Sequence, residues 1–169
     1  FESWMRLLHA VPGSVLWLKA SVGEAADNLR TAARQLGIGR ERLVFAGNAP
    51  AGLHLARPAL ADLFLDTAPY NAHATACDAL WAGLPVLTCA GRGYAARVAT
   101  SLLTALEMDE LVTHTPKEYE TLALALARDP ARLKTLRDRL ADKRRTAPLF
   151  DTPRFARDLE AAYAAMLDR

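Results

Sequence analysis

The sequence has no long hydrophobic run and few cysteines. No stretch of about eighteen apolar residues occurs among its 169 residues, so we expect no membrane-spanning helix and no membrane partner. Cys77 and Cys89 lie twelve residues apart without a Cys-x-x-Cys pattern, which indicates neither a disulfide framework nor a metal site. A reducing, cytoplasmic setting is therefore expected, with no bound metal.

A concentration of charge of one sign is also missing. The formal net charge is +2, and 21 basic and 19 acidic residues are mixed along the chain. The densest basic run, DKRR at 142–145, lies in a charged helical stretch typical of a solvated face. Because nucleic-acid binding needs a concentrated basic stripe, the sequence predicts no nucleic-acid partner.

The amino terminus has neither an initiator Met nor the basic-then-apolar pattern of a secretory signal. We therefore expect the chain to begin inside a longer protein. Its 169 residues, with 51% hydrophobic and 24% charged residues, suit one soluble globular domain.

Apolar strands alternate with amphipathic helices along the whole chain. Strands are expected at 14–20, 42–47, 62–66 and 85–88, with a short final strand at 110–113. Helices are expected at 2–11, 23–37, 50–57, 74–83 and 93–106, and from Pro116 nearly to the end. This alternation predicts an α/β fold with a Rossmann-like, doubly wound parallel sheet over 1–169 and a C-terminal helical arm at about 150–169.

Ligands of such sheets bind beyond the carboxyl ends of the strands, in the loops that lead into helices. The candidate loops follow Leu18, Phe45, Leu65 and Thr88. The sequence therefore directs attention to polar residues in these four loops.

The loop after Leu65 carries several polar residues just before a predicted helix. The start of a helix stabilises an anion by roughly 0.3 to 1 kcal/mol, and Ala74 would let a phosphate approach its backbone. His73 and Thr75 could donate further hydrogen bonds, and Asp78 could accept them from sugar hydroxyls. This pattern favours a nucleotide diphosphate and its ribose.

An alternative interpretation of the same loop needs no ligand. Thr75 and Asp78 have the spacing of a capping box, in which Thr75 caps the helix and Asp78 reaches back to the backbone. His73 would then be an ordinary turn residue.

The loop after Phe45 predicts a second part of the site. Asn48 is a suitable cap and Pro50 a suitable first residue for a short helix, which puts His54 and Arg57 on one face. A planar base could stack on either side chain, while the backbone near Ala49 contacts the base edge. Alternatively, Arg57 pairs with a surface carboxylate and His54 is merely exposed.

The loop after Thr88 and the remaining histidines give weaker signals. Gly91 and Gly93 resemble a phosphate loop only superficially, because the third glycine is missing. Arg97 could neutralise a phosphate, but we favour a structural role. His9 and His114 have no ligand partners at metal-binding spacing, so both are interpreted as structural or exposed.

Five segments of the chain together resemble the carboxyl-terminal catalytic lobe of the O-GlcNAc transferase family. They are VPGSVLWL, RLVFAGNAP, ADLFLDTAPYNAHATACDALWAGLPVLT, AARVATSLL and PLFDTPRFARDLEAAY. The resemblance implies a GT-B glycosyltransferase, in which two Rossmann-like lobes enclose the active site and this lobe holds a UDP-sugar. It implies inverting transfer of GlcNAc from UDP-GlcNAc to Ser or Thr hydroxyls of a protein acceptor, without a metal ion or other cofactor.

The resemblance also implies roles for individual residues at the base end of the nucleotide. The Ala49 backbone matches the group that contacts uracil, Arg57 matches its packing partner, and His54 matches a histidine against the nucleotide.

At the phosphate end, His73, Ala74 and Thr75 match the helix start that grips the diphosphate. Asp78 matches a carboxylate that holds the ribose, and Tyr70 lies at a position near the sugar pocket.

The chain departs from the family pattern at several positions. Ala51 stands where some relatives have a lysine, Ala74 stands where threonine is common, and AGRGYAARV replaces a Pro-Gly-x-Thr-like loop. A donor-contacting lysine would lie upstream of Phe1. The catalytic residues are unknown from this sequence, because the resemblance places the proton acceptor in an amino-terminal lobe.

These departures leave alternative functions open. The intact protein could be a UDP-glucose-dependent protein glucosyltransferase, or a degenerate lobe that serves as a nucleotide-binding or scaffold module. For an active enzyme, the resemblance implies two partners within the same protein, the amino-terminal catalytic lobe and a tetratricopeptide (TPR) array.

Overall fold

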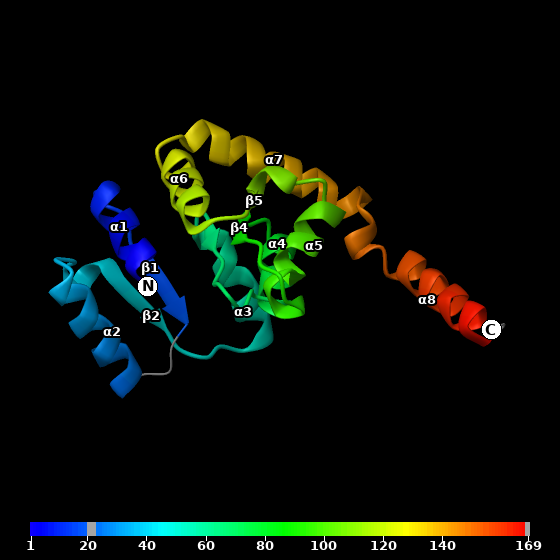
Figure 1. Ribbon diagram of the computed structural model, residues 1–169, viewed down its shortest axis with the longest axis horizontal. Coiled ribbons are helices and arrows are strands. Elements are labelled where there is room, and N and C mark those ends of the chain that lie inside the picture. The colour runs from blue at the N-terminus through cyan, green and yellow to red at the C-terminus, as the bar shows by residue number, and fades with distance from the viewer. Residues whose placement is uncertain (20–22, 168–169) are drawn as a thin grey trace.

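The computed structural model describes residues 1–19 and 23–167 (Figure 1). The strand expected over 14–20 is present as β1 (Leu16–Lys19). Ala20, the end of that expected strand, and most of the loop after it lie outside the described residues, as do residues 168 and 169 of the expected C-terminal arm.

Short parallel strands form the centre of the molecule and confirm the α/β fold class. β1 pairs with β2 (Leu43–Ala46), and β4 (Val86–Cys89) lies between β3 (Phe64–Leu65) and β5 (Val112–Thr113). The strands form two parallel sheets within the described residues, rather than the single sheet expected, because β1 and β3 do not pair.

Helices connect the strands and cover the sheets (Figure 1). They are α1 (Glu2–Ala10), α2 (Glu24–Gln35), α3 (Ala51–Ala56), α4 (Ala74–Trp81), α5 (Val98–Ala105), α6 (Pro116–Ala127), α7 (Pro130–Thr146) and α8 (Thr152–Leu167). Among these described helices, none is long and apolar enough to cross a membrane.

From Pro116 onward the chain is helical nearly to its end, as expected, and two prolines mark the divisions between the separate helices. Asp129 accepts a hydrogen bond from the Arg132 amide at 2.9 Å and so caps α7, with Pro130 near its first position. Pro148 begins a short 3-10 turn that separates α7 from α8. Proline lacks an amide hydrogen, so it starts a helix more readily than it continues one.

The main core surrounds β4, the middle strand of its sheet. Val86, Leu87 and Thr88 are fully buried, and Leu80 of α4 and Leu103 of α5 are fully buried in the same half of the molecule. A second core joins α1, α2, β1 and β2. Cover on both faces thus explains why β4 is nearly continuously apolar.

Helix α8 extends away from the rest of the molecule (Figure 1). All of its described side chains are exposed, including Phe155, Leu159 and Tyr163. The helix expected near 152–167 is therefore present, and its apolar residues contribute nothing to either core.

Candidate functional site

The loops after β2 and β3 meet at the carboxyl ends of the strands. His54 Nε2 on α3 lies 3.5 Å from Asp78 Oδ2 on α4, and both side chains are about one-third exposed, at 33% and 39%. The structure therefore brings together two residues that the sequence assigns to one ligand from separate loops.

Arg57 fixes the loop after β2. Its Nη1 donates a hydrogen bond to the Gly47 carbonyl at 2.6 Å, so the alternative of pairing with a surface carboxylate is not observed. Arg57 begins a 3-10 turn that follows α3, and half-buried Ala49 lies in the loop that this bond holds. The expected Asn48 cap is wrong, since the residue before the helix is Pro50.

The start of α4 differs from the expected capping box. The N-cap is His73, without a side-chain hydrogen bond to the helix, and Thr75 is the second residue of the helix. The Asp78 carboxylate lies beside His54 instead of capping the helix. The capping-box alternative is therefore wrong, because the helix begins one residue before Thr75.

This arrangement leaves donors at the first turn of α4. The amides of Ala76 and Cys77 both donate to the His73 carbonyl at 3.1 Å. The amides of Ala74 and Thr75 precede them and have no acceptor within the helix, and both residues are exposed. Together with the helix dipole, these amides can bind an anion.

Two exposed tyrosines enclose the His73 ring. The Tyr70 ring stacks on it with centroids 4.9 Å apart, and the Tyr94 ring meets it edge-on at 6.0 Å. His73 Nε2 is buried and has no hydrogen-bond partner among the described residues. Tyr70 and Tyr94 are 63% and 77% exposed, so the rings that cover this nitrogen lie at the surface of the molecule.

Asp66 shapes the loop after β3, although the sequence marked it only as the end of a strand. Its Oδ1 accepts hydrogen bonds from the amides of Thr67 at 2.8 Å and Ala72 at 2.7 Å. Its Oδ2 accepts one from the Thr88 hydroxyl at 2.6 Å. Burial raises the pKa of the Asp66 carboxyl, and these three bonds oppose that rise.

Buried Asn71 connects this loop to the loop after β4. Its amide N–H donates to the Ala95 carbonyl and its Nδ2 donates to the Thr67 carbonyl, both at 2.9 Å. An aspartate directly after an apolar strand, with an asparagine five residues later, was the available signal for this scaffold.

Gly91, in the loop after β4, has a structural explanation. A Cβ added at Gly91 would lie 2.6 Å from the Ala96 Cβ, and the Gly91 amide donates to the Ala96 carbonyl at 2.8 Å. Gly91 therefore allows a tight loop closure that carries Tyr94 toward His73. Arg97 is exposed, and its backbone carbonyl accepts the Ser101 hydroxyl.

The other two histidines lie outside this site. His9 is exposed and its Nε2 is 2.7 Å from the Leu36 carbonyl oxygen. His114 is exposed, and its backbone amide donates to Glu118. The part of the chain that the structure describes contains no cluster of three His, Cys, Asp or Glu side chains suited to a metal ion.

Comparison with known proteins gives a consistent assignment. The sequence model described as glycosyl transferase family 41 matches residues 1–159. The chain is 35% identical over 168 residues to "UDP-N-acetylglucosamine--peptide N-acetylglucosaminyltransferase" of Caenorhabditis elegans. This match covers 99% of the chain and 15% of the relative. The chain therefore spans a small part of the relative that it matches.

Two solved structures are similar to the chain. A mutant O-GlcNAc transferase of Thermobaculum terrenum superposes with a TM-score of 0.90 at 34% identity, over 98% of this chain and 32% of that one. WaaG, a glycosyltransferase involved in lipopolysaccharide biosynthesis, superposes with a TM-score of 0.61 at 24% identity, over 94% and 42% of the two chains. The second likeness concerns the fold alone, which is that of a GT-B lobe.

Proposed function

Because this chain belongs to glycosyl transferase family 41, we propose that it is the nucleotide-sugar-binding lobe of an inverting protein glycosyltransferase. The intact enzyme moves GlcNAc from UDP-GlcNAc to Ser or Thr hydroxyls of a protein acceptor. The amino-terminal lobe supplies the proton acceptor, and a TPR array of the same protein presents the acceptor. The reaction requires no metal ion, and the enzyme acts in the cytoplasm.

The observation that carries this proposal is the 3.5 Å contact between His54 Nε2 and Asp78 Oδ2. Resemblance assigns these residues to one nucleotide, and the contact joins the two loops that would hold its two ends. Asp78 is not used to cap its own helix, so its carboxylate can accept hydrogen bonds from ribose hydroxyls.

The diphosphate fits the start of α4. The free amides of Ala74 and Thr75, together with the helix dipole, give this end of α4 a partial positive charge that attracts the diphosphate. His73 Nε2 can donate a further hydrogen bond once a tyrosine ring moves aside. Negative charge grows on UDP as the bond to the sugar breaks. Donors fixed in advance stabilise this charge more in the transition state than in the ground state.

The uracil base fits the loop after β2. The bond from Arg57 Nη1 to the Gly47 carbonyl holds this loop in place, so the Ala49 backbone can contact the edge of the base. Tyr70 is exposed and stacks on His73, and the family resemblance assigns it to the sugar pocket.

Sugar transfer by the intact protein tests this proposal. We expect labelled GlcNAc to pass from UDP-GlcNAc to protein hydroxyls, and His73→Ala to lower kcat by about a hundredfold, as for loss of one oxyanion donor. His114→Ala is the matched control, since His114 is an exposed histidine outside the site. Equal rates for the two variants would remove His73 from the site.

A second candidate function is favoured by one observation. Ala74 occupies the exposed first position of α4, where a threonine hydroxyl would otherwise reach a phosphate. A lobe weakened there could bind nucleotide without turnover and act as a scaffold. Such a protein would bind UDP but neither transfer nor hydrolyse UDP-GlcNAc, so the same assay separates the two candidates.

A further inference from the structure

Tyr94 has an exposed ring on a tightly held backbone. The residue is 77% exposed and begins a short 3-10 turn that ends at Ala96. The Ala96 amide donates to the Gly93 carbonyl at 3.1 Å, and the Arg97 amide donates to the Tyr94 carbonyl at 3.0 Å. The loop after β4 therefore fixes the backbone of Tyr94 without burying its ring, so core packing does not explain an aromatic residue at this position.

A backbone hydrogen bond also sets the distance between Tyr94 and His73. The Asn71 amide donates to the Ala95 carbonyl at 2.9 Å. The first of these residues lies two positions before His73, and the second directly follows Tyr94. Because Asn71 is fully buried, water does not compete for this bond. The two loops therefore bring the two rings together independently of the contact between the rings themselves.

The His73 ring is contacted from two directions. Tyr70 stacks on its face with centroids 4.9 Å apart and an angle of 16° between the ring planes. Tyr94 meets it with centroids 6.0 Å apart and the planes at 85°. Stacked and edge-on arrangements at such distances are the preferred geometries of aromatic pairs. An imidazole held in this way by two rings has little freedom to rotate about its side-chain bonds.

The orientation of His73 matters because of its Nε2 atom. This atom is buried and has no hydrogen-bond partner among the described residues. A buried polar atom without a partner is costly, so a ligand that supplies the missing partner is favoured there. The direction in which Nε2 points therefore depends on the surrounding rings rather than on a bond within the described part of the chain.

We propose that Tyr94 is a positioning residue, whose ring holds the His73 imidazole so that Nε2 donates to the diphosphate of a bound UDP-sugar. This inference rests on the proposed function and adds Tyr94 to it. Tyr70, which the family resemblance assigns to the sugar pocket, is the ring that moves aside when the sugar enters. A donor oriented in advance stabilises the negative charge on the departing UDP without a cost of reorganisation.

Two departures of the chain from the family pattern fit this role. Ala74 lacks the hydroxyl that a threonine would offer to a phosphate. The segment AGRGYAARV, which contains Tyr94, replaces a Pro-Gly-x-Thr-like loop. With fewer hydroxyl donors near the start of α4, the diphosphate depends more on His73, and the orientation of that ring has a larger effect on binding and transfer.

UDP binding and sugar transfer by the intact protein test the proposal. We expect Tyr94→Ala to raise the Kd for UDP by about 3- to 10-fold and to lower kcat by about tenfold, because the imidazole loses its orientation. Tyr94→Phe keeps the ring and is the matched control, so both values should stay within about twofold of those of the unmodified protein. Equal effects of the two substitutions, or no effect of Tyr94→Ala, overturn the proposal.

A double-mutant cycle separates positioning from a direct contact with the ligand. If Tyr94 acts through His73, Tyr94→Ala should change the Kd and kcat by less than about twofold in a His73→Ala background. An equal change in both backgrounds overturns the proposal, because Tyr94 would then act on the ligand itself. The Kd for UDP decides the question even in a protein without turnover.

Failure of this inference differs from failure of the proposed function. A loss of affinity and rate in His73→Ala, with none in Tyr94→Ala, rejects the role of Tyr94 and leaves the proposed function standing. An unchanged Kd and kcat in His73→Ala removes His73 from the site and rejects this inference with it.

Discussion

Asp66 is the residue on which the geometry of the candidate site depends most. Its carboxylate is 3% exposed and accepts hydrogen bonds from Thr67, Ala72 and Thr88. Two of these bonds close the loop that leads to His73, and the third ties the loop to β4. A buried carboxylate with three donors organises a loop that side-chain packing alone would leave open.

Removal of Asp66 should therefore destabilise the fold. We expect Asp66→Ala to lower the free energy of unfolding by about 3 kcal/mol, because it leaves buried donors without an acceptor. Urea denaturation of both variants measures the difference. Asp138→Ala is the control: it removes an exposed carboxylate paired with Lys134 and should cost at most about 0.5 kcal/mol. Equal decreases in the free energy of unfolding for Asp66→Ala and Asp138→Ala would contradict the structural role of Asp66.

The sequence predicted which residues belong to the candidate site, but it did not predict their contacts with one another. The spacing of Thr75 and Asp78 allowed two interpretations, in which the Asp78 carboxylate either reaches back to its own backbone or faces a bound ligand. In the structure Asp78 lies beside His54, and α4 begins at Ala74, two residues earlier than a Thr75 cap requires. A shift of two residues at a helix boundary lies below what sequence patterns resolve.

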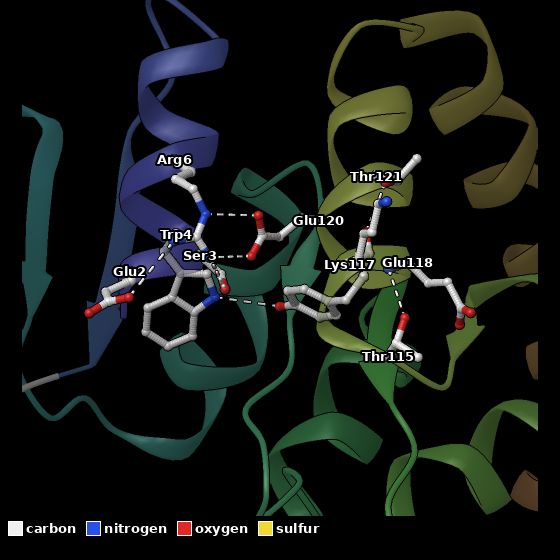
Figure 2. Close-up of polar contacts among 10 residues, drawn as sticks. Glu2, Ser3, Trp4, Arg6, Thr115, Lys117, Glu118, Glu120 and Thr121 are labelled. Carbon is white, nitrogen blue, oxygen red and sulfur yellow. Dashed lines mark hydrogen bonds and ion pairs between the residues drawn. The ribbon is translucent and has the colours of Figure 1, made fainter.

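At the scale of elements, α1 depends on α6 for its position. The Arg6–Glu120 ion pair joins the two helices (Figure 2), and the glutamate side chain is 24% exposed. The hydrogen bond from Arg6 holds the pKa of Glu120 well below its usual value of 4.5, at about 2. Because the pKa of Glu120 is lower in the folded protein than in the unfolded chain, the ionised carboxylate stabilises the folded state.

This pair should make stability depend on pH in a defined window. Its contribution is complete above pH 4.5 and is lost as pH falls through about 2. Because the pair is partly exposed, the loss should be about 1 kcal/mol or less. Thermal unfolding between these pH values should show a smaller fall for Arg6→Gln than for the unmodified protein.

The control for this pH dependence is Arg145→Gln. Arg145 pairs with Asp142 on one face of α7, where both side chains are about three-quarters exposed, at 76% and 74%. This substitution should leave the pH profile unchanged. If Arg6→Gln and Arg145→Gln changed the pH dependence of thermal unfolding equally, the Arg6–Glu120 pair would not be the cause of that dependence.

Element positions were predictable wherever the local pattern was strong. The expected strand at 85–88 is β4, whose first three residues are fully buried. β3 has only two residues of the five expected, because strand length also depends on a neighbour at each edge. The break before α7 was present in the sequence as Asp129-Pro130, a cap followed by a helix-starting proline.

At the scale of the whole molecule, two halves meet along an apolar groove between β1 and β3 and at a few helix contacts. Alternation of strands and helices predicted the α/β class, because each strand carries its own periodic signal. It could not predict that β1 and β3 remain apart, because pairing is a long-range property that local periodicity does not encode. The family resemblance adds a prediction that periodicity cannot make, namely that the loops after β2 and β3 hold one nucleotide.

Calorimetric titration of the intact protein with UDP tests the central claim most directly. Asp78→Ala removes the proposed acceptor for the ribose hydroxyls, and Arg57→Ala removes the hydrogen bond that holds the loop carrying Ala49. We expect each to raise the Kd for UDP by about 10- to 100-fold, while Asp138→Ala leaves it unchanged. Equal affinity for UDP in all three variants and the unmodified protein would contradict the assignment of this site.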